Sequence, residues 1–320
     1  MVYDCDTFKY ALEGISTVGD PHHLAVSSCL FVSVITFVAS TLTRNYSQTD
    51  KVWSVVPFLY TWMAVCDART LVMAIVATIW GFRLTWNFNR RGGYKWPPWD
   101  GDEDYRWQFL QDGALLETLK NKFAWAVFNL TFISFYQNVL LLLISTPSFV
   151  AWSAAKSPEC LDSFTPWGSI DSVATVLFLL FVTLESVADN QQWAFQKEKK
   201  RRLALGEELV GEYADGFCQS GCFAIVRKPN YAAEQAIWIS FYLYSVGATG
   251  GYWLNYSSVG SVLLVLLFQG SGWFTENITL TRHPKYTQYQ KRVPLYIPNP
   301  LLLLRTSSFR ERKQCIGKEN

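Results

Sequence analysis

The chain has 320 residues, of which 50% are hydrophobic and 16% aromatic, and its formal net charge is only +2. Its long apolar runs carry almost no charge, whereas the segments between them carry nearly all of it. This distribution is typical of a chain that crosses a membrane several times, and it disfavours a large soluble helical bundle. We therefore expect an all-α, polytopic membrane bundle in contact with lipid, without a nucleic-acid partner and without a metal site.

Seven apolar segments approach the length that a helix needs to cross a bilayer, about 20 residues with a range of about 17 to 25. In chain order they are 23–42, 52–66, 71–87, 123–144, 170–188, 232–246 and 253–274. The second and the sixth are short for a span. We expect residues 1–304 to form a single transmembrane bundle with its cofactor site in the carboxy-terminal half. The polar, basic segment 305–320 is expected to be a disordered tail.

The cations between these segments alternate along the chain. Basic residues gather at 44–51, at 90–122, at 197–228 and after 282, whereas the other connectors carry few. Because cytosolic connectors are enriched in Lys and Arg, seven spans place every basic connector and the carboxy terminus in the cytosol. We expect a multi-pass protein of the endoplasmic reticulum.

A first polar cluster, ADNQQWAFQKEKKRR, stands where the fifth apolar segment ends. Asp189, Trp193 and Lys197 are spaced four residues apart, so they share one helical face. The carboxylate and the amides at 190–192 suit the hydroxyls and the amide edge of a nucleotide, and the cations after them suit phosphate. For the run 199–202, contact with anionic lipid headgroups is the simpler interpretation.

A second cluster, RKPNYAAE, precedes the sixth apolar segment. Pro229 disfavours helix at the residue before it and can itself begin a helix. Asn230, Tyr231 and Glu234 then fall in the first turns, where free N–H groups and the helix dipole favour a phosphate. The alternatives are a plain cap at Asn230 and a simple dipole partner at Glu234.

A third cluster, TENITLTRHPKYTQYQKRVPLYIP, covers the end of the last apolar segment and the polar residues after it. Its cations alternate with tyrosines, among them Arg282 and Tyr289, and such a run can stack on an adenine ring and hold phosphate. The same pattern is ordinary for a segment at the membrane surface. His283 has no second histidine nearby, which argues against a metal ion there.

Two charged residues lie inside apolar segments. Arg83 stands near the end of the third segment, with Arg91 just beyond it, and Glu185 stands one turn before Asp189. A charge within a membrane is costly unless it snorkels to the surface or is paired. We expect Arg83 to point into the bundle and to pair with Glu185, with snorkelling as the alternative.

Taken together, these clusters resemble the steroid 5-alpha-reductase-like family, and more closely its uncharacterised membrane branch. In that branch a W-x-x-R-L…EDxRW block precedes an ADNQQ…RxPNYxxE block, and the similarity here covers about 52–298. The resemblance implies a helical membrane bundle that holds NADPH and reduces a conjugated C=C bond of a lipid-like or steroid-like substrate from the bilayer. By motif it implies cofactor contacts at Asp189, Asn230, Tyr231 and Glu234, and phosphate or nicotinamide-side contacts at Arg83, Arg227 and Arg282.

The three clusters and the exit of the third segment add further expected cofactor residues: Arg91, Asn190, Lys197 and Tyr289. No glycine motif of the Rossmann or P-loop type occurs, so a nucleotide would be held in another way.

The sequence also departs from that family. Lys228 replaces the histidine of RHPNY, the segment 52–66 lacks the glutamate of steroid reductases, and Trp80 stands where their catalytic tyrosine would be. Cofactor binding is therefore better supported than steroid reduction. We expect the catalytic residues to be Tyr60 and Glu185, because a buried phenol can donate a hydrogen bond to a forming enolate.

Two alternatives remain open at this stage. A membrane methyltransferase of the isoprenylcysteine type has a similar carboxy-terminal arrangement, but S-adenosylmethionine lacks phosphate and gains little from a cationic loop. A non-catalytic, lipid-binding relative would have kept the fold and lost the acid.

Overall fold

The computed structural model describes residues 20–97, 99–113, 115–156 and 166–299, and within these ranges it contains helices and no strand. The tail predicted at 305–320 lies outside the described residues. The chain divides into two compact units. The first unit comprises the residues up to 179 together with 237–265, and the second comprises 180–236 together with the residues from 266 onward. Three long helices contribute to both units: α9 (Ser169–Ala204), α11 (Pro229–Ala248) and α12 (Ser258–Arg282).

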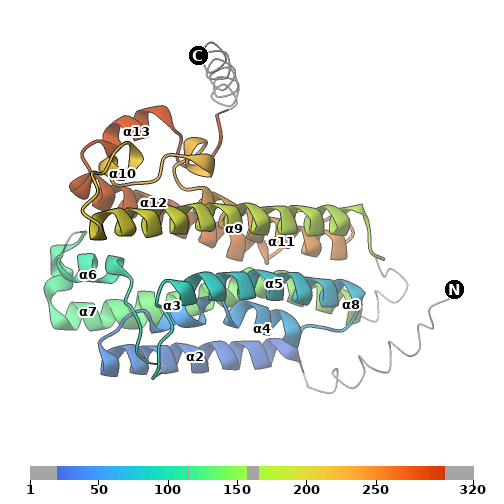
Figure 1. The fold of residues 1–320 in the computed structure, drawn as a ribbon. Helices are drawn as coiled ribbons and strands as arrows, with labels where there is room; N and C mark the ends of the chain where they lie inside the picture. Colours follow the sequence, from blue (N-terminus) through green and yellow to red (C-terminus); the bar gives the residue numbers. More distant parts are fainter. Residues whose placement is uncertain (1–19, 98, 114, 157–165, 300–320) are drawn as a thin grey trace, which may run out of the picture. The chain divides into compact units, whose positions relative to one another are not determined.

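Five helices in the described ranges are long and apolar enough to cross a membrane, which confirms the all-helical membrane bundle (Figure 1). They are α2 (Pro21–Thr43), α5 (Ala68–Arg90), the continuous helix Lys122–Lys156, α9 and α12. The predicted sixth span corresponds to α11, which has 20 residues but is less apolar than these five. The count of seven spans stays a prediction.

The predicted second span, 52–66, is not a single helix. It is divided between α3 (Gln48–Trp53) and α4 (Val56–Met63), and α4 has only eight residues. The break follows from Pro57, because a proline inside a helix lacks the N–H donor and its ring collides with the carbonyl four residues earlier, here that of Trp53. At 1.5 Å per residue, α4 is roughly 12 Å long and cannot cross a bilayer alone.

Local sequence explains where the other helices of the first unit begin. Asp67 caps α5 in a reciprocal capping box with Thr70, and the Asn121 side chain accepts from the first N–H groups of α7 (Lys122–Phe128). From there the chain continues through a π-helical stretch, η2 (Asn129–Tyr136), into α8 (Gln137–Lys156). Two short helices, α6 (Tyr105–Gln111) and η1 (Glu117–Lys120), lie in the connector before α7.

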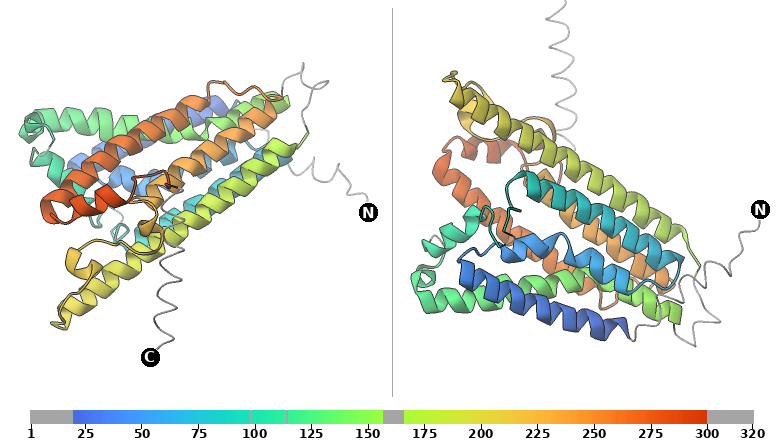
Figure 2. Two further views of the ribbon diagram at one scale, coloured as in Figure 1. Left: turned by 90° about the horizontal axis from the view of Figure 1, so that it is seen from above. Right: turned by 60° about the horizontal axis from the view of Figure 1, so that its bottom comes forward.

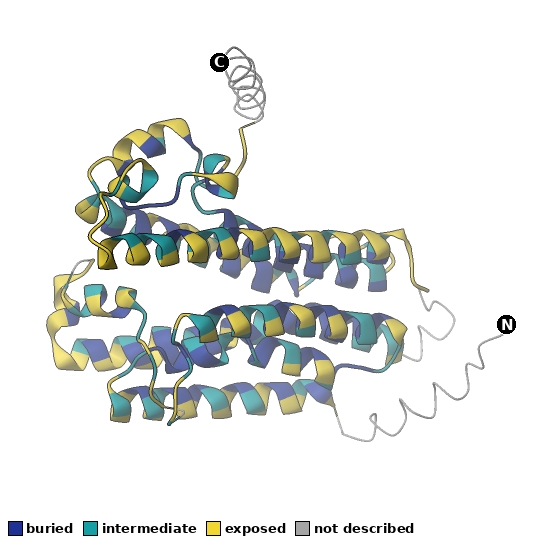
Figure 3. Cartoon of the chain, viewed as in Figure 1, coloured by how far each residue is buried: buried dark blue, intermediate teal, exposed yellow. Residues whose placement is uncertain are grey.

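The first unit is built on contacts among α2, α4, α5 and α8, which run alongside one another in Figures 1 and 2. Its core includes Trp80 of α5, which is fully buried and meets Trp238 of α11 edge to face at a centroid distance of 4.8 Å. Large apolar side chains remain exposed along the helices, Leu42 at 78% and Phe31 at 67% among them. Exposed positions recur along the helices in Figure 3. Exposed apolar faces of this kind suit helices surrounded by lipid.

The EDxRW block fastens the connector before α6 to the segment after α2. Glu103 accepts from the backbone N–H of Tyr46 at 2.6 Å, Asp104 caps α6, and the Trp107 indole donates to Asp50 at 3.1 Å. The contacts of these residues are thus contacts within the first unit.

The second unit contains three further short helices: α10 (Glu212–Asp215), η4 (Gly221–Ala224) and α13 (Tyr286–Arg292). A buried cluster of three aromatic residues and one valine packs α13 against the segment after α10: Phe217, Tyr286, Tyr289 and Val293. A second buried cluster joins α9, through Ala188 and Phe195, to Cys218 and Phe223. These two clusters hold the polar connectors 205–228 and 283–296 in place.

At two glycines of α12, we expect the substitution by alanine to have opposite effects on the free energy of unfolding. A Cβ at Gly260 would lie 2.2 Å from the Leu143 carbonyl oxygen of α8, whereas a Cβ at Gly270 meets nothing within 4 Å. We expect Gly260→Ala to lower the free energy of unfolding by about 1–3 kcal/mol, because two helix backbones must move apart. Gly270→Ala should leave it unchanged or raise it by up to about 1 kcal/mol, because alanine is the better helix former.

Thermal unfolding of both variants in the same detergent measures this difference. Equal melting temperatures for the two variants would show that α12 does not approach α8 as closely as the structure has it.

Candidate functional site

Asp189 and Asn230, 41 residues apart in sequence, lie next to each other in the second unit. The Asn230 Nδ2 atom is 3.5 Å from Oδ1 of Asp189, at the long end of the hydrogen-bonding range. α9 continues to Ala204, so Asp189 lies in the middle of a helix. Pro229 is the first residue of α11, as predicted, and Asn230 therefore stands in its first turn. The two clusters that were expected to share a ligand are thus brought together.

Three buried carboxylates belong to the same part of the second unit. Glu185 and Asp189, one turn apart on α9, are 5% and 3% exposed, and Glu234 of α11 is 4% exposed. An ionised carboxylate accepts hydrogen bonds and cannot donate them. Several acceptors at one place suit a ligand that carries hydroxyl or amide donors. Asn190 and Lys197 are exposed on α9, and Tyr231 is half-buried in the first turn of α11, where its ring meets Phe268 of α12.

Gln191 has a structural contact that the sequence did not reveal. Its side-chain oxygen accepts from the backbone N–H of Cys222 at 2.8 Å, which ties α9 to η4. Gly221, with φ at +59°, packs directly against this amide, where a side chain would collide with it.

Arg227 lies in a dense network of contacts. Its Nε and one terminal nitrogen donate to the two oxygens of Glu276 at 2.6 and 2.9 Å, and its other terminal nitrogen donates to the carbonyls of Gln290 and Val293. These contacts use four of the five N–H donors of a guanidinium. They join the entry of α11 to α12 and α13, so the described contacts of Arg227 are structural. Its predicted phosphate contact stays a prediction.

Glu276 completes this network. It accepts from the Tyr286 hydroxyl at 2.8 Å and from the Gln290 amide at 3.0 Å, in addition to Arg227. Burial, together with the neighbouring Glu276 carboxylate, raises the pKa of Tyr286 far above its ordinary value. The phenol therefore stays protonated and donates.

Tyr289 belongs to the core. It is 2% exposed, its ring lies 5.4 Å from that of Phe217, and its hydroxyl donates to the Phe223 carbonyl. Stacking on an adenine needs an accessible ring face, whereas the described contacts give this ring a packing role. Arg282, by contrast, is exposed at the end of α12.

Two cations of the basic run at 197–202 form ion pairs with neighbouring carboxylates. Arg201 pairs with Glu198 and Glu207, and Arg202 pairs with Glu198 while lying 4.3 Å over the Tyr213 ring. These pairs reduce the positive charge that this end of α9 offers to a phosphate.

The remaining predicted residues lie in the first unit. Tyr60 of α4 is 1% exposed, and its hydroxyl lies beside the Cys29 thiol without a hydrogen bond of ordinary geometry to any described residue. Arg91 is exposed at the end of α5. Arg83 belongs to the first unit and Glu185 to the second, so the pairing expected for them stays a prediction.

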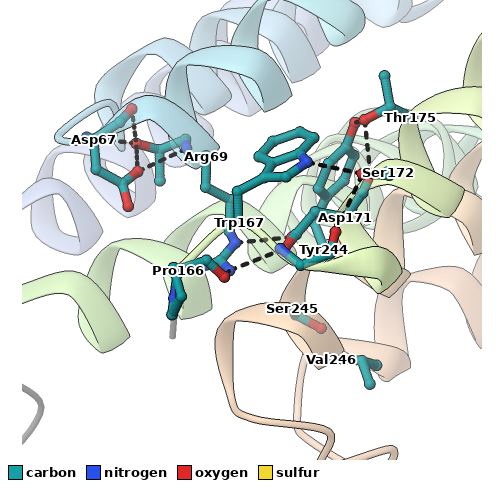
Figure 4. Close-up of polar contacts among 12 residues, drawn as sticks. Asp67, Arg69, Pro166, Trp167, Asp171, Ser172, Thr175, Tyr244, Ser245 and Val246 are labelled. Atoms are coloured by element: carbon teal, nitrogen blue, oxygen red, sulfur yellow. Dashed lines mark hydrogen bonds and ion pairs between the residues drawn. The ribbon is translucent and has the colours of Figure 1, made fainter. Parts of the chain in front are cut away.

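A buried ion pair in the first unit was not predicted from the sequence (Figure 4). Arg69 of α5 donates from Nε and from one terminal nitrogen to the two oxygens of Asp171 of α9, at 2.8 and 3.0 Å. The Asp171 side chain also accepts from the Gly168 N–H at 2.8 Å. The sequence did carry a signal for this pair. Arg69 and Asp171 are charged residues in the first turns of two apolar helices, and a lone charge in such a position needs a partner.

The fold and these contacts define a polytopic, all-helical membrane protein with a buried polar cluster where α9 meets the start of α11. Residues 36–293 match the family described as protein of unknown function DUF1295, and the chain belongs to that family. It is 31% identical over 274 residues, 81% of this chain and 74% of the relative, to the uncharacterized protein C594.04c of Schizosaccharomyces pombe. No solved structure matches the chain.

Proposed function

We propose that this protein is an NADPH-dependent membrane reductase that acts on a conjugated carbon–carbon double bond of a hydrophobic, lipid-like or steroid-like substrate. The observation that carries the proposal is the contact between Asp189 and Asn230. It unites the ADNQQ and RKPNYAAE clusters, on which the resemblance to steroid 5-alpha-reductase-like proteins chiefly depends.

The residues of this cluster suit a dinucleotide. Asp189 and Glu234 supply buried acceptors for ribose hydroxyls and for the carboxamide N–H groups, and Asn230 supplies both a donor and an acceptor. The first turn of α11 adds backbone N–H groups and the positive end of a helix dipole, both of which favour phosphate. Bound NADPH would supply the hydride.

In this proposal Tyr60 and Glu185 act on the substrate. Tyr60 has a buried hydroxyl whose proton is not donated to any acceptor in good geometry within the described residues, so it can donate to a substrate carbonyl. A donor aimed at the oxygen where negative charge develops lowers the barrier to hydride addition at the conjugated carbon. Glu185 is proposed as the second acid, buried in α9.

NADPH at a hundredfold excess over its dissociation constant should stabilise the purified protein by about 2.7 kcal/mol. Asn230→Ala should abolish this stabilisation, because it removes both the donor and the acceptor at the start of α11, and it should leave the protein inserted. Asn89→Ala, near the end of α5 in the first unit, serves as the matched control and should keep the full response. An unchanged response in Asn230→Ala would refute the proposed site.

One observation favours a second candidate, a methyltransferase that uses S-adenosylmethionine. Because Arg201, Arg202 and Arg227 have carboxylate partners, fewer cations remain for the phosphates of a dinucleotide. The same stabilisation experiment separates the two candidates: a response to S-adenosylmethionine and not to NADPH identifies the methyltransferase. A protein that responds to neither is better described as a non-catalytic lipid-binding relative.

A further inference from the structure

Two basic side chains converge on the peptide of Gly216 in the second unit. Lys199 of α9 donates from Nζ to the Gly216 carbonyl at 3.1 Å. The His283 ring covers the same glycine so closely that a Cβ there would lie 2.3 Å from its Cε1 atom. Gly216 ends α10 with φ at +92°, a conformation that favours glycine. Arg282, exposed at the end of α12, immediately precedes His283.

The charges around this point are mainly positive. Burial lowers the pKa of His283, and the nearby charges of Lys199 and Arg282 lower it further, so both cations lie within electrostatic range of His283. The nearest acid along the chain, Asp215, is engaged elsewhere: its two oxygens accept from Lys285 at 2.9 Å and from Gln219 at 2.8 Å.

Donors remain for a ligand. A lysine ammonium has three N–H donors, and the contact with Gly216 uses one of those of Lys199. His283 is half-buried, and its neutral imidazole can donate from one ring nitrogen. Cations and N–H donors gathered at one place are the groups that recognise a phosphate.

We infer that Lys199, Arg282 and His283 form a binding site for a phosphate monoester above Gly216. The monoester can come from the 2′-phosphate of a nicotinamide cofactor, in which case the inference rests on the proposed function, or from the headgroup of a phosphatidic acid. Lys199 follows Asp189 by ten residues on α9, roughly 15 Å along the helix axis. A dinucleotide bound at Asp189 extends far enough to reach that point, and its 2′-phosphate is the group that distinguishes NADPH from NADH.

Lys199→Gln and His283→Gln test the cofactor source. Each removes a basic group and keeps a side chain that can donate a hydrogen bond. The affinity for NADPH should fall by about tenfold or more, which is the loss expected for one charge-assisted hydrogen bond, and the affinity for NADH should not change. Lys291→Gln, at an exposed position of α13, is the matched control and should bind both nucleotides as the wild type does.

The outcomes separate this inference from the proposed function. If NADPH and NADH both bind and the two variants weaken them equally or not at all, the phosphate site is refuted while the reductase proposal stands. If neither nucleotide binds the wild type, the proposed function fails and the lipid source is tested instead. Short-chain phosphatidic acid should then raise the melting temperature more than phosphatidylcholine of the same chain length, and Lys199→Gln should remove that difference. Equal effects of the two lipids would overturn the inference.

Discussion

Asp171→Asn is expected to lower the free energy of unfolding of the first unit by about 3–5 kcal/mol, because it leaves a buried guanidinium without its counter-charge. The side chains of Arg69 and Asp171 are 5% and 1% exposed. Arg69 is further held by the Pro166 carbonyl at 3.0 Å, so it cannot easily turn to solvent. Inside a protein the attraction between such a pair is strong, but it mainly offsets the cost of burying the charges.

The exposed pair of Lys95 and Asp102 provides the control, since its side chains are 49% and 62% exposed. Asp102→Asn should leave the melting temperature unchanged, because solvent screens exposed pairs. Thermal unfolding in detergent, followed by tryptophan fluorescence, measures both variants. Similar melting temperatures for Asp171→Asn and Asp102→Asn would show that Arg69 does not depend on Asp171.

Glu276→Gln should have the second large effect, a loss of about 3 kcal/mol in the second unit. The Arg227 and Glu276 side chains are 10% and 9% exposed, and the change leaves Arg227 without a counter-charge. It also replaces one carboxylate oxygen by a donor, which faces either the Tyr286 hydroxyl or the Gln290 amide. Because the same network positions the start of α11, NADPH affinity should fall together with stability.

Glu207→Gln is the control for this prediction. Glu207 pairs with Arg201 in an exposed setting, with side chains 42% and 48% exposed, and its loss should change neither stability nor cofactor affinity. If Glu276→Gln keeps wild-type stability, the network around Arg227 does not hold the second unit together.

The helical class and most helix positions could be predicted from local sequence. Hydropathy located the five helices long enough to span, and Pro229 marked the start of α11, because these signals depend on residues close together in the chain. The division of 52–66 was also encoded locally, at Pro57, but its apolar composition outweighed that signal in the prediction. The length of α9 was missed because the predicted span ended at residue 188, where the apolar run stops.

The candidate site was predicted in part. The neighbours Asp189 and Asn230 were correctly placed together, since both flank polar breaks in apolar sequence. The structural contacts of Arg227 and Tyr289 were not foreseen, because a cation or a tyrosine looks the same in sequence whether it meets a ligand or another part of the chain. Their partners are 49 and 66 residues away.

Composition and the spacing of apolar residues by themselves determined that this chain is a helical membrane protein, and they indicated where its polar clusters lie. Only the tertiary structure decided which charges neutralise one another, as in the pairs Arg69–Asp171 and Arg227–Glu276, and which cations surround Gly216. The physical reason is the separation along the chain over which each interaction acts. Helix formation and hydropathy depend on neighbours within a few turns, whereas burial and charge pairing depend on how distant helices pack.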